Sequence, residues 1–301
     1  HVDINSENVL GDLPAVVQMN IKNVSDEGSP FGFGLGTEFL IGLRSKSRGA
    51  DFISQINISD EHLPSGITIT NHSGSAAWSD APDTPVGREL QISSTSTANH
   101  IVSILLDRTI ANQYTGRYRV FYISNGASEF EGEHWTVGLT VRINSASTYI
   151  DGVKIYESSH ERVGTRPFCP HDLGELHLPA TLGANLSNIR FIISTRMSGS
   201  TVTQMTHSMG RLVLIPADEC AIHVSANELS NSDAVGESNY LQIDSTKPKR
   251  QIHASLKNNT NDDLVTNSKA SGNGPFILQA NSDQRLHILT IHNNLLTGGT
   301  Q

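Results

Sequence analysis

Short segments in which apolar and polar residues alternate recur along this chain, and this recurrence most restricts its fold. Clear examples are Phe52–Ile58, Gly66–Thr70 and Glu89–Ser93. Each is bounded by Asn, Asp, Gly, Ser or Pro, and a two-residue period is that of a strand with one buried face. The regular spacing of the segments predicts an all-β protein of the β-sandwich or jelly-roll type rather than βαβ units.

The stretch Met209–Ser225 contains the strongest candidate for a domain border. Leu212–Ile215 suit a buried strand, and the following Pro216 has no N–H group to donate to a sheet. Ile222–Val224 then begin a second alternating run. Since 301 residues are enough for two domains with their own cores, we expect a border at this point.

The expected domains are therefore a β-sandwich or jelly-roll-like domain over residues 1–215 and a smaller immunoglobulin-like domain over residues 216–301. Periodicity fades between Ser145 and Pro179, where Pro, His and charged residues accumulate. This stretch is either an insertion loop region or an alternative domain border near Ser145.

Composition restricts the class of partner. The net charge is −9 with 21 basic residues, which argues against nucleic acid because phosphate neutralisation needs clustered Lys and Arg. Charged residues make up only 17% of the chain, a composition common in secreted β proteins and in viral or phage shells. No run of about twenty apolar residues is present, so we expect no membrane insertion. A chain that starts at His1 suggests a mature secreted product or a proteolytic fragment.

A carbohydrate site pairs an aromatic face with polar groups that match the sugar hydroxyls. Trp78 and Asp80 lie in a polar stretch rich in Gly and Ser, which favours an exposed binding aromatic, although Trp78 is also suited to a core or loop-anchoring role. An Asn-Gly pair before Ala127 predicts a hairpin that would bring Trp135 beside Arg117 and Arg119. The position of Trp135 in an alternating strand favours a core role as the alternative.

The densest group of metal-ligating residue types is in the stretch Phe168–His177. It contains Cys169, His171 and His177, together with two carboxylates, and zinc or copper would need three or four such ligands converging. None of the familiar ligand spacings occurs. A polar loop without metal is the alternative, and no cofactor is required.

His1 offers an amine and an imidazole, two arms of a copper-binding histidine brace as found in lytic polysaccharide monooxygenases. A third nitrogen would have to come from His62, His72, His100 or His134. Apart from this, no catalytic signature is present, since there is no Gly-x-Ser-x-Gly elbow and no convincing pair of carboxylates. The chain is therefore expected to bind without turnover.

The residues from Pro216 onward resemble the pilin half of a two-domain tip adhesin of chaperone–usher fimbriae. The resemblance rests on Cys220 just inside the first strand, the alternating Tyr240–Ile243, and Leu286–Ile291 near the end. It implies an incomplete immunoglobulin-like pilin domain completed by a donated strand. It also implies a secreted protein that passes through the periplasm to the cell surface (fimbrium), with a periplasmic chaperone and a neighbouring pilus subunit as partners.

Cysteine usage departs from that family. The usual second cysteine of the pilin domain is absent near Asp244. Either Cys220 reaches back to Cys169 in a disulfide, or both thiols are free.

The expected function is adhesion: the first domain binds a host or surface glycan, or another receptor, and the second joins a pilus. A capsid or spike jelly-roll protein of a virus or phage is the structural alternative. A secreted copper enzyme using His1 is the enzymatic one.

Overall fold

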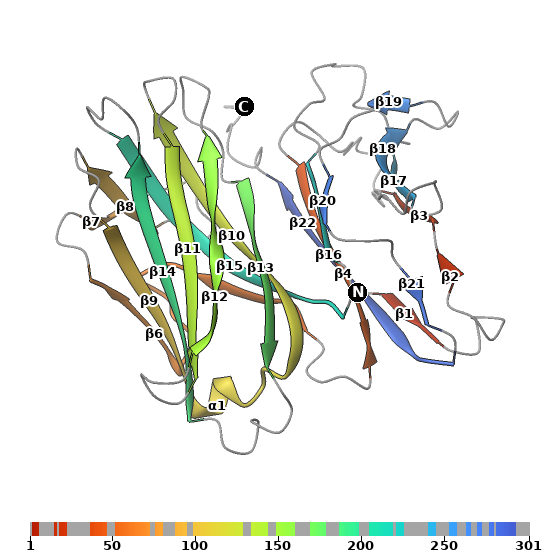
Figure 1. Ribbon diagram of the computed structural model, residues 1–301, viewed down its shortest axis with the longest axis horizontal. Coiled ribbons are helices and arrows are strands. Elements are labelled where there is room, and N and C mark those ends of the chain that lie inside the picture. The colour runs from red at the N-terminus through yellow and green to blue at the C-terminus, as the bar shows by residue number, and fades with distance from the viewer. Residues whose placement is uncertain are drawn as a thin grey trace, which may run out of the picture. The chain divides into compact units, whose positions relative to one another are not determined.

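The protein is described from a computed structural model, shown in Figure 1. The residues that the structure describes are 2–5, 15–16, 18–22, 37–46, 52–72, 76–80, 88–94, 99–128, 134–143, 149–159, 169–178, 187–198, 205–218, 221–225, 240–244, 253–257, 263–265, 270–272, 277–279 and 281–292. They are almost entirely strands, and the all-β prediction is confirmed.

The chain divides into two compact units. One consists of residues 53–214 and is called the sandwich unit here; the other combines residues 1–52 with 215–301 and is called the split unit. Each is described on its own.

Two sheets build the sandwich unit. The first has the strand order β13 (Cys169–Leu178), β10 (Gly116–Ser128), β15 (Met205–Pro216), β8 (Arg88–Ser94) and β7 (Ala76–Asp80), and β5 (Ser54–Asn57) pairs with another part of β15. The second has the order β12 (Tyr149–Ser159), β11 (His134–Ile143), β14 (Asn188–Ser198), β9 (Asn99–Asp107) and β6 (Ile67–Asn71). A single helical turn, α1 (Arg108–Ala111), follows β9.

Alternate residues of the second sheet form part of the core. Val102, Ile104 and Leu106 of β9 are fully buried, and each lies opposite a fully buried residue of β14. A residue two positions along a strand returns to the same face, so the period-two pattern seen in the sequence marks the buried face.

Two local expectations were wrong. The predicted hairpin does not form, because β10 pairs with β13 and β11 pairs with β12 and β14, in different sheets. Its Asn-Gly turn, Asn125-Gly126, lies inside β10. The stretch from Ser145 to Pro179, expected as an insertion loop or a border, contains the long strands β12 and β13.

The split unit has a main sheet with the order β1 (Val2–Ile4), β22 (Gln284–His292), β4 (Thr37–Ser45), β16 (Ala221–Ser225) and β20 (Ala270–Gly272). A second sheet has the order β19 (Asp263–Val265), β18 (His253–Lys257), β17 (Tyr240–Asp244) and β3 (Gln18–Lys22), and β2 (Ala15–Val16) pairs with β21 (Ile277–Leu278).

This division differs from the predicted one at its N-terminal side. β4 lies between β22 and β16 and pairs with both, which places residues 1–52 with the C-terminal strands rather than in a domain over residues 1–215. The change of unit near Ile215 agrees with the break seen in the sequence. The assignment of receptor binding and pilin-like roles to two domains stays a prediction. Within the described residues, no helix is long and apolar enough to cross a bilayer.

Candidate functional site

The residues predicted to bind a ligand lie in three separate places of the sandwich unit. Trp78 and Asp80 belong to β7, at one edge of the first sheet. Arg117 and Arg119 belong to β10, and β8 and β15 lie between the two strands. At a strand spacing of about 4.8 Å, β7 and β10 are about 14 Å apart.

The strand of Trp135 does not pair with the strand that carries the two arginines. It lies in β11 of the second sheet, where it pairs in register with Ser158 and Met197. The predicted neighbourhood depended on the hairpin that does not form. Strand pairing therefore makes neither Trp78 nor Trp135 a direct neighbour of Arg117 and Arg119. Ligand binding by any of these residues stays a prediction.

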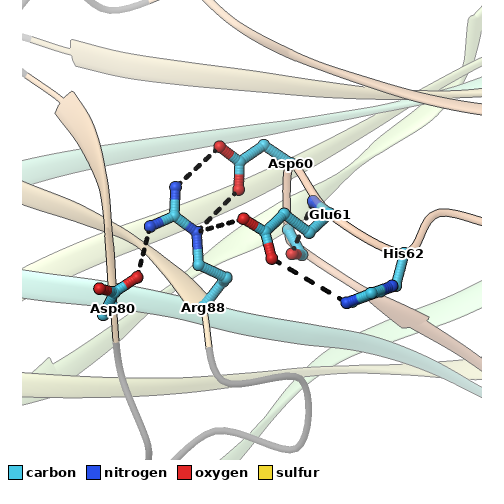
Figure 2. Close-up of polar contacts among 6 residues, drawn as sticks. Asp60, Glu61, His62, Asp80 and Arg88 are labelled. Atoms are coloured by element: carbon cyan, nitrogen blue, oxygen red, sulfur yellow. Dashed lines mark hydrogen bonds and ion pairs between the residues drawn. The ribbon is translucent and has the colours of Figure 1, made fainter.

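Asp80 belongs to a cluster of charged side chains around Arg88 (Figure 2). The Arg88 guanidinium donates to Asp80 Oδ1 at 2.7 Å and to both carboxylate oxygens of Asp60, at 3.2 and 3.0 Å. Glu61 Oε1 lies 3.5 Å from Arg88 Nε. One guanidinium thus holds carboxylates from β7 and from the segment after β5.

Local structure explains why these side chains meet. Asp80 and Arg88 are cross-strand partners at the end of the β7–β8 pair. Asp60 and Glu61 follow β5 in the connection that leads to β6 of the other sheet. In this connection, Ser59 Oγ accepts from the Glu61 N–H at 3.1 Å, and His62 has a left-handed φ of 55°.

Hydrogen bonding within the Arg88 cluster favours the charged forms of Arg88 and Asp60. The hydrogen bonds from Arg88 lower the pKa of Asp60. The hydrogen bonds to Asp60 and Asp80 in turn raise the pKa of Arg88. The Asp80 side chain is 90% exposed, whereas that of Asp60 is 32% exposed. Asp80 accordingly accepts a hydrogen bond from Arg88 while its carboxylate remains open to solvent.

Trp78 lies two residues before Asp80 on the same face of β7. It is half-buried, and its cross-strand partner Leu90 is fully buried. An aromatic side chain at the margin of the core is therefore followed by an exposed, oriented carboxylate on an edge strand. Sequence reasoning identified Trp78 and Asp80 but missed Arg88, Asp60 and Glu61.

A second ion pair involves the predicted residue Arg119. Its Nε and Nη2 atoms donate to the two carboxylate oxygens of Asp172 in β13, at 2.7 and 2.6 Å. The side chains of Arg119 and Asp172 are 12% and 8% exposed. This pairing occupies Arg119 within the protein. Arg117 is exposed and lies opposite His177.

The predicted metal residues lie on β13 rather than in a loop. His171 pairs in register with Tyr122, and His177 pairs with Arg117. Among the described residues, no group of three or more His, Cys, Asp or Glu side chains is arranged to hold a metal ion. Cys169 begins β13, whereas Cys220 and His1 lie outside the described residues. The disulfide and the copper site at His1 therefore stay predictions.

Comparisons with known proteins give weak structural similarities. No family model and no curated protein matches the chain. The K3 cleaved adhesin domain of Lys-gingipain from Porphyromonas gingivalis W83 has 12% identity and a TM-score of 0.30, over 53% of this chain and 98% of that one. A carbohydrate-binding module of family 29 has 15% identity and a TM-score of 0.30, over 55% and 91%.

The CBM22-1–GH10 modules of endo-1,4-β-D-xylanase 10B from Clostridium thermocellum, complexed with xylohexaose, have 11% identity and a TM-score of 0.33. The match covers 54% of this chain and 29% of that chain. Because these identities and TM-scores are low, the similarities carry no functional argument. The proposed function rests on the residues of the chain itself.

Proposed function

We propose that this protein is a non-catalytic surface adhesin whose sandwich unit binds a glycan at the sheet edge formed by β7. The observation that carries the proposal is the pair of Trp78, half-buried, and Asp80, exposed and held by Arg88. The strand fixes their spacing, and the ion pair fixes the carboxylate.

The chemistry of this pair suits a sugar. The apolar face of an indole packs against the C–H face of a pyranose ring, and a carboxylate accepts hydrogen bonds from neighbouring hydroxyl groups. Because Arg88 already orients Asp80, less side-chain entropy is lost when a ligand binds. No reaction is assigned to the site, since its groups suffice for recognition alone.

A glycan array with the full chain, followed by titration of the best hits, tests the proposal. Trp78→Ala and Asp80→Asn are expected to weaken binding by about tenfold or more, whereas Trp78→Phe retains part of it. Thr68→Ala, at an exposed position of β6, is the matched control and is expected to bind as the unaltered protein does. Absence of binding to every glycan, or full binding by Trp78→Ala, would contradict the proposal.

Attachment to a fibre by a donated strand, after chaperone-assisted passage through the periplasm, is the second part of the proposal. It is supported by β22, which pairs with β4 over its whole length but with β1 only over Gln284, Arg285 and Leu286. Among the described strands, none pairs with the β1 side of β22 at residues 288–292. An unpaired strand edge can accept an added strand.

Thermal unfolding with synthetic peptides tests this second part. A peptide with alternating apolar residues is expected to raise the melting temperature of the split unit, because it binds only the folded state. The control is the same peptide with its alternate apolar residues replaced by Ser. Equal melting temperatures with both peptides would argue against strand donation and leave glycan binding unaffected.

A further inference from the structure

Arg211 of β15 is held by neutral side chains. Its Nε donates to Asn57 Oδ1 at 2.7 Å, and its Nη1 donates to Gln55 Oε1. Both partners come from β5, where Asn57 lies directly opposite Arg211. Gln55 is exposed, and Arg211 and Asn57 are half-buried.

Hydrogen-bond geometry leaves one edge of this guanidinium available. An arginine carries five N–H donors in a planar fork, and the two amide oxygens use one on Nε and one on Nη1. The remaining N–H groups lie on Nη1 and Nη2. These two atoms form the edge that binds the two oxygens of a carboxylate in parallel.

In the part of the chain that the structure describes, no Asp or Glu side chain forms an ion pair with Arg211. Other arginines of the unit differ: Arg119 binds Asp172, and Arg88 binds Asp60 and Asp80. Burial lowers the pKa of Arg211. A partly desolvated cation is normally paired, because leaving it unpaired costs free energy.

We propose that Arg211, oriented by Asn57 and Gln55, binds the carboxylate of an acidic sugar, so that the ligand of this protein is a uronic- or sialic-acid-containing oligosaccharide. This inference rests on the proposed glycan binding, since a glycan is taken as the source of the carboxylate. The two amides act as positioning residues. They direct the fork without neutralising it, and the ligand supplies the missing negative charge.

Calorimetric titration of the full chain with a panel of uronic- and sialic-acid oligosaccharides, each beside its neutral counterpart, tests the inference. At least one acidic member is expected to bind at least tenfold more tightly than its neutral counterpart, with a preference that declines at high salt. Arg211→Gln is expected to remove that preference. Arg211→Lys, which keeps the charge but loses the fork, is expected to retain only part of it.

Arg108→Gln is the matched control, because it removes one positive charge from an exposed position of the same unit. It is expected to leave the acidic preference unchanged, and the far-ultraviolet circular dichroism of every variant should match that of the unaltered protein. The acidic preference surviving in Arg211→Gln, or no acidic preference in the unaltered protein, would overturn the inference. Sodium acetate binding as tightly as the oligosaccharides would also overturn it, since the sugar would then play no part.

The two proposals fail in distinguishable ways. Binding of glycans that depends on Trp78 but not on Arg211 overturns the inference and leaves the proposed function standing. Absence of binding to neutral and acidic glycans alike overturns both. Loss of acidic-glycan binding in Arg211→Gln, with other glycans still bound, supports both.

Discussion

Arg119 and Asp172 form a two-pronged ion pair across a bulge between β10 and β13. The pairing register shifts between Val120 and Phe121, and Asp172 Oδ1 also accepts from the Gly174 N–H at 2.9 Å. Gly174 has a φ of 104°, a backbone conformation that residues other than glycine rarely adopt. The carboxylate thus ties the bulge to the neighbouring strand.

Asp172→Ala is expected to destabilise the sandwich unit by about 3 kcal/mol, because it removes the carboxylate that accepts two hydrogen bonds from the largely buried Arg119. Urea unfolding monitored by fluorescence measures the change. The double variant Arg119→Met with Asp172→Ala is expected to be more stable than Asp172→Ala alone, since it also removes the largely buried cation that has lost this carboxylate. A double variant that is less stable than the single one would show that the cost arises elsewhere.

The stability of β1 is expected to depend on pH through Asp3. Arg285 binds both oxygens of this carboxylate, at 2.6 and 3.2 Å, and Lys46 Nζ lies 3.1 Å away. The hydrogen bonds from Arg285, then from Lys46, lower the pKa of Asp3 from 3.8 to about 2. A folded-state pKa below the unfolded value gives a contribution that is present above pH 3.8 and is lost as pH falls toward 2.

Nuclear magnetic resonance titration of the Asp3 carboxyl, together with amide exchange of β1, measures this dependence. The carboxyl is expected to titrate near pH 2, and exchange in β1, corrected for its intrinsic pH dependence, is expected to accelerate over the same range. In Asp3→Asn this component is absent. An ordinary aspartate titration in the folded protein would contradict the ion-pair geometry.

Alternation predicted where most strands form but not which strands pair. Phe52–Ile58 was expected as a strand and contains β5, where Ser54 and Ile56 are buried and Gln55 is exposed, so the sequence pattern reports that burial. The Asn125-Gly126 pair has strong turn propensity, yet β10 continues through it, paired with β13 in the register up to Ser124. Local preference was outweighed by pairing with a segment about fifty residues away.

Long-range pairing also explains why the sequence did not predict the place of β4 or the whole charged cluster around Arg88. Nothing in the sequence of β4 indicates that it lies between β16 and β22. Asp80 was chosen from its polar surroundings, whereas Arg88 was not, although opposite charges on either side of a short Pro- and Gly-containing segment are a detectable hairpin signal. Asp60 joins the cluster only through the tertiary fold.

The sandwich unit is expected to lose stability below neutral pH through His100. This residue is 2% exposed and lies opposite the fully buried Thr195. Burial lowers the pKa of His100 below 6.5. Since the unfolded chain takes up the proton first, the contribution is present above pH 6.5 and is lost as pH falls through the folded-state pKa.

Urea unfolding between pH 7 and pH 5 is the measurement, with His100→Leu as the comparison. The variant removes the titrating group from a buried position, so its stability is expected to vary less with pH than that of the unaltered protein. Identical pH slopes in the two proteins would show that another group governs the dependence.

Gly42 of β4 is expected to be intolerant of any side chain. A methyl group there would overlap the Pro216 carbonyl oxygen and lie 2.5 Å from Ile215 Cγ2. Gly42 is also paired on both sides, with Ala221 and with His287. Because a backbone carbonyl and two paired strands cannot shift independently, Gly42→Ala is expected to destabilise the split unit by about 3 kcal/mol.

Urea unfolding of Gly42→Ala and Gly42→Ser checks this, with Ser expected to cost at least as much as Ala because it is larger. The sandwich unit provides an internal control, since the transition assigned to it by the Asp172→Ala variant should keep its midpoint. A Gly42→Ala protein with an unchanged transition in the split unit would mean that the segment at Ile215 and Pro216 does not pack on β4 as described. The change of unit at that point would then lose its structural support.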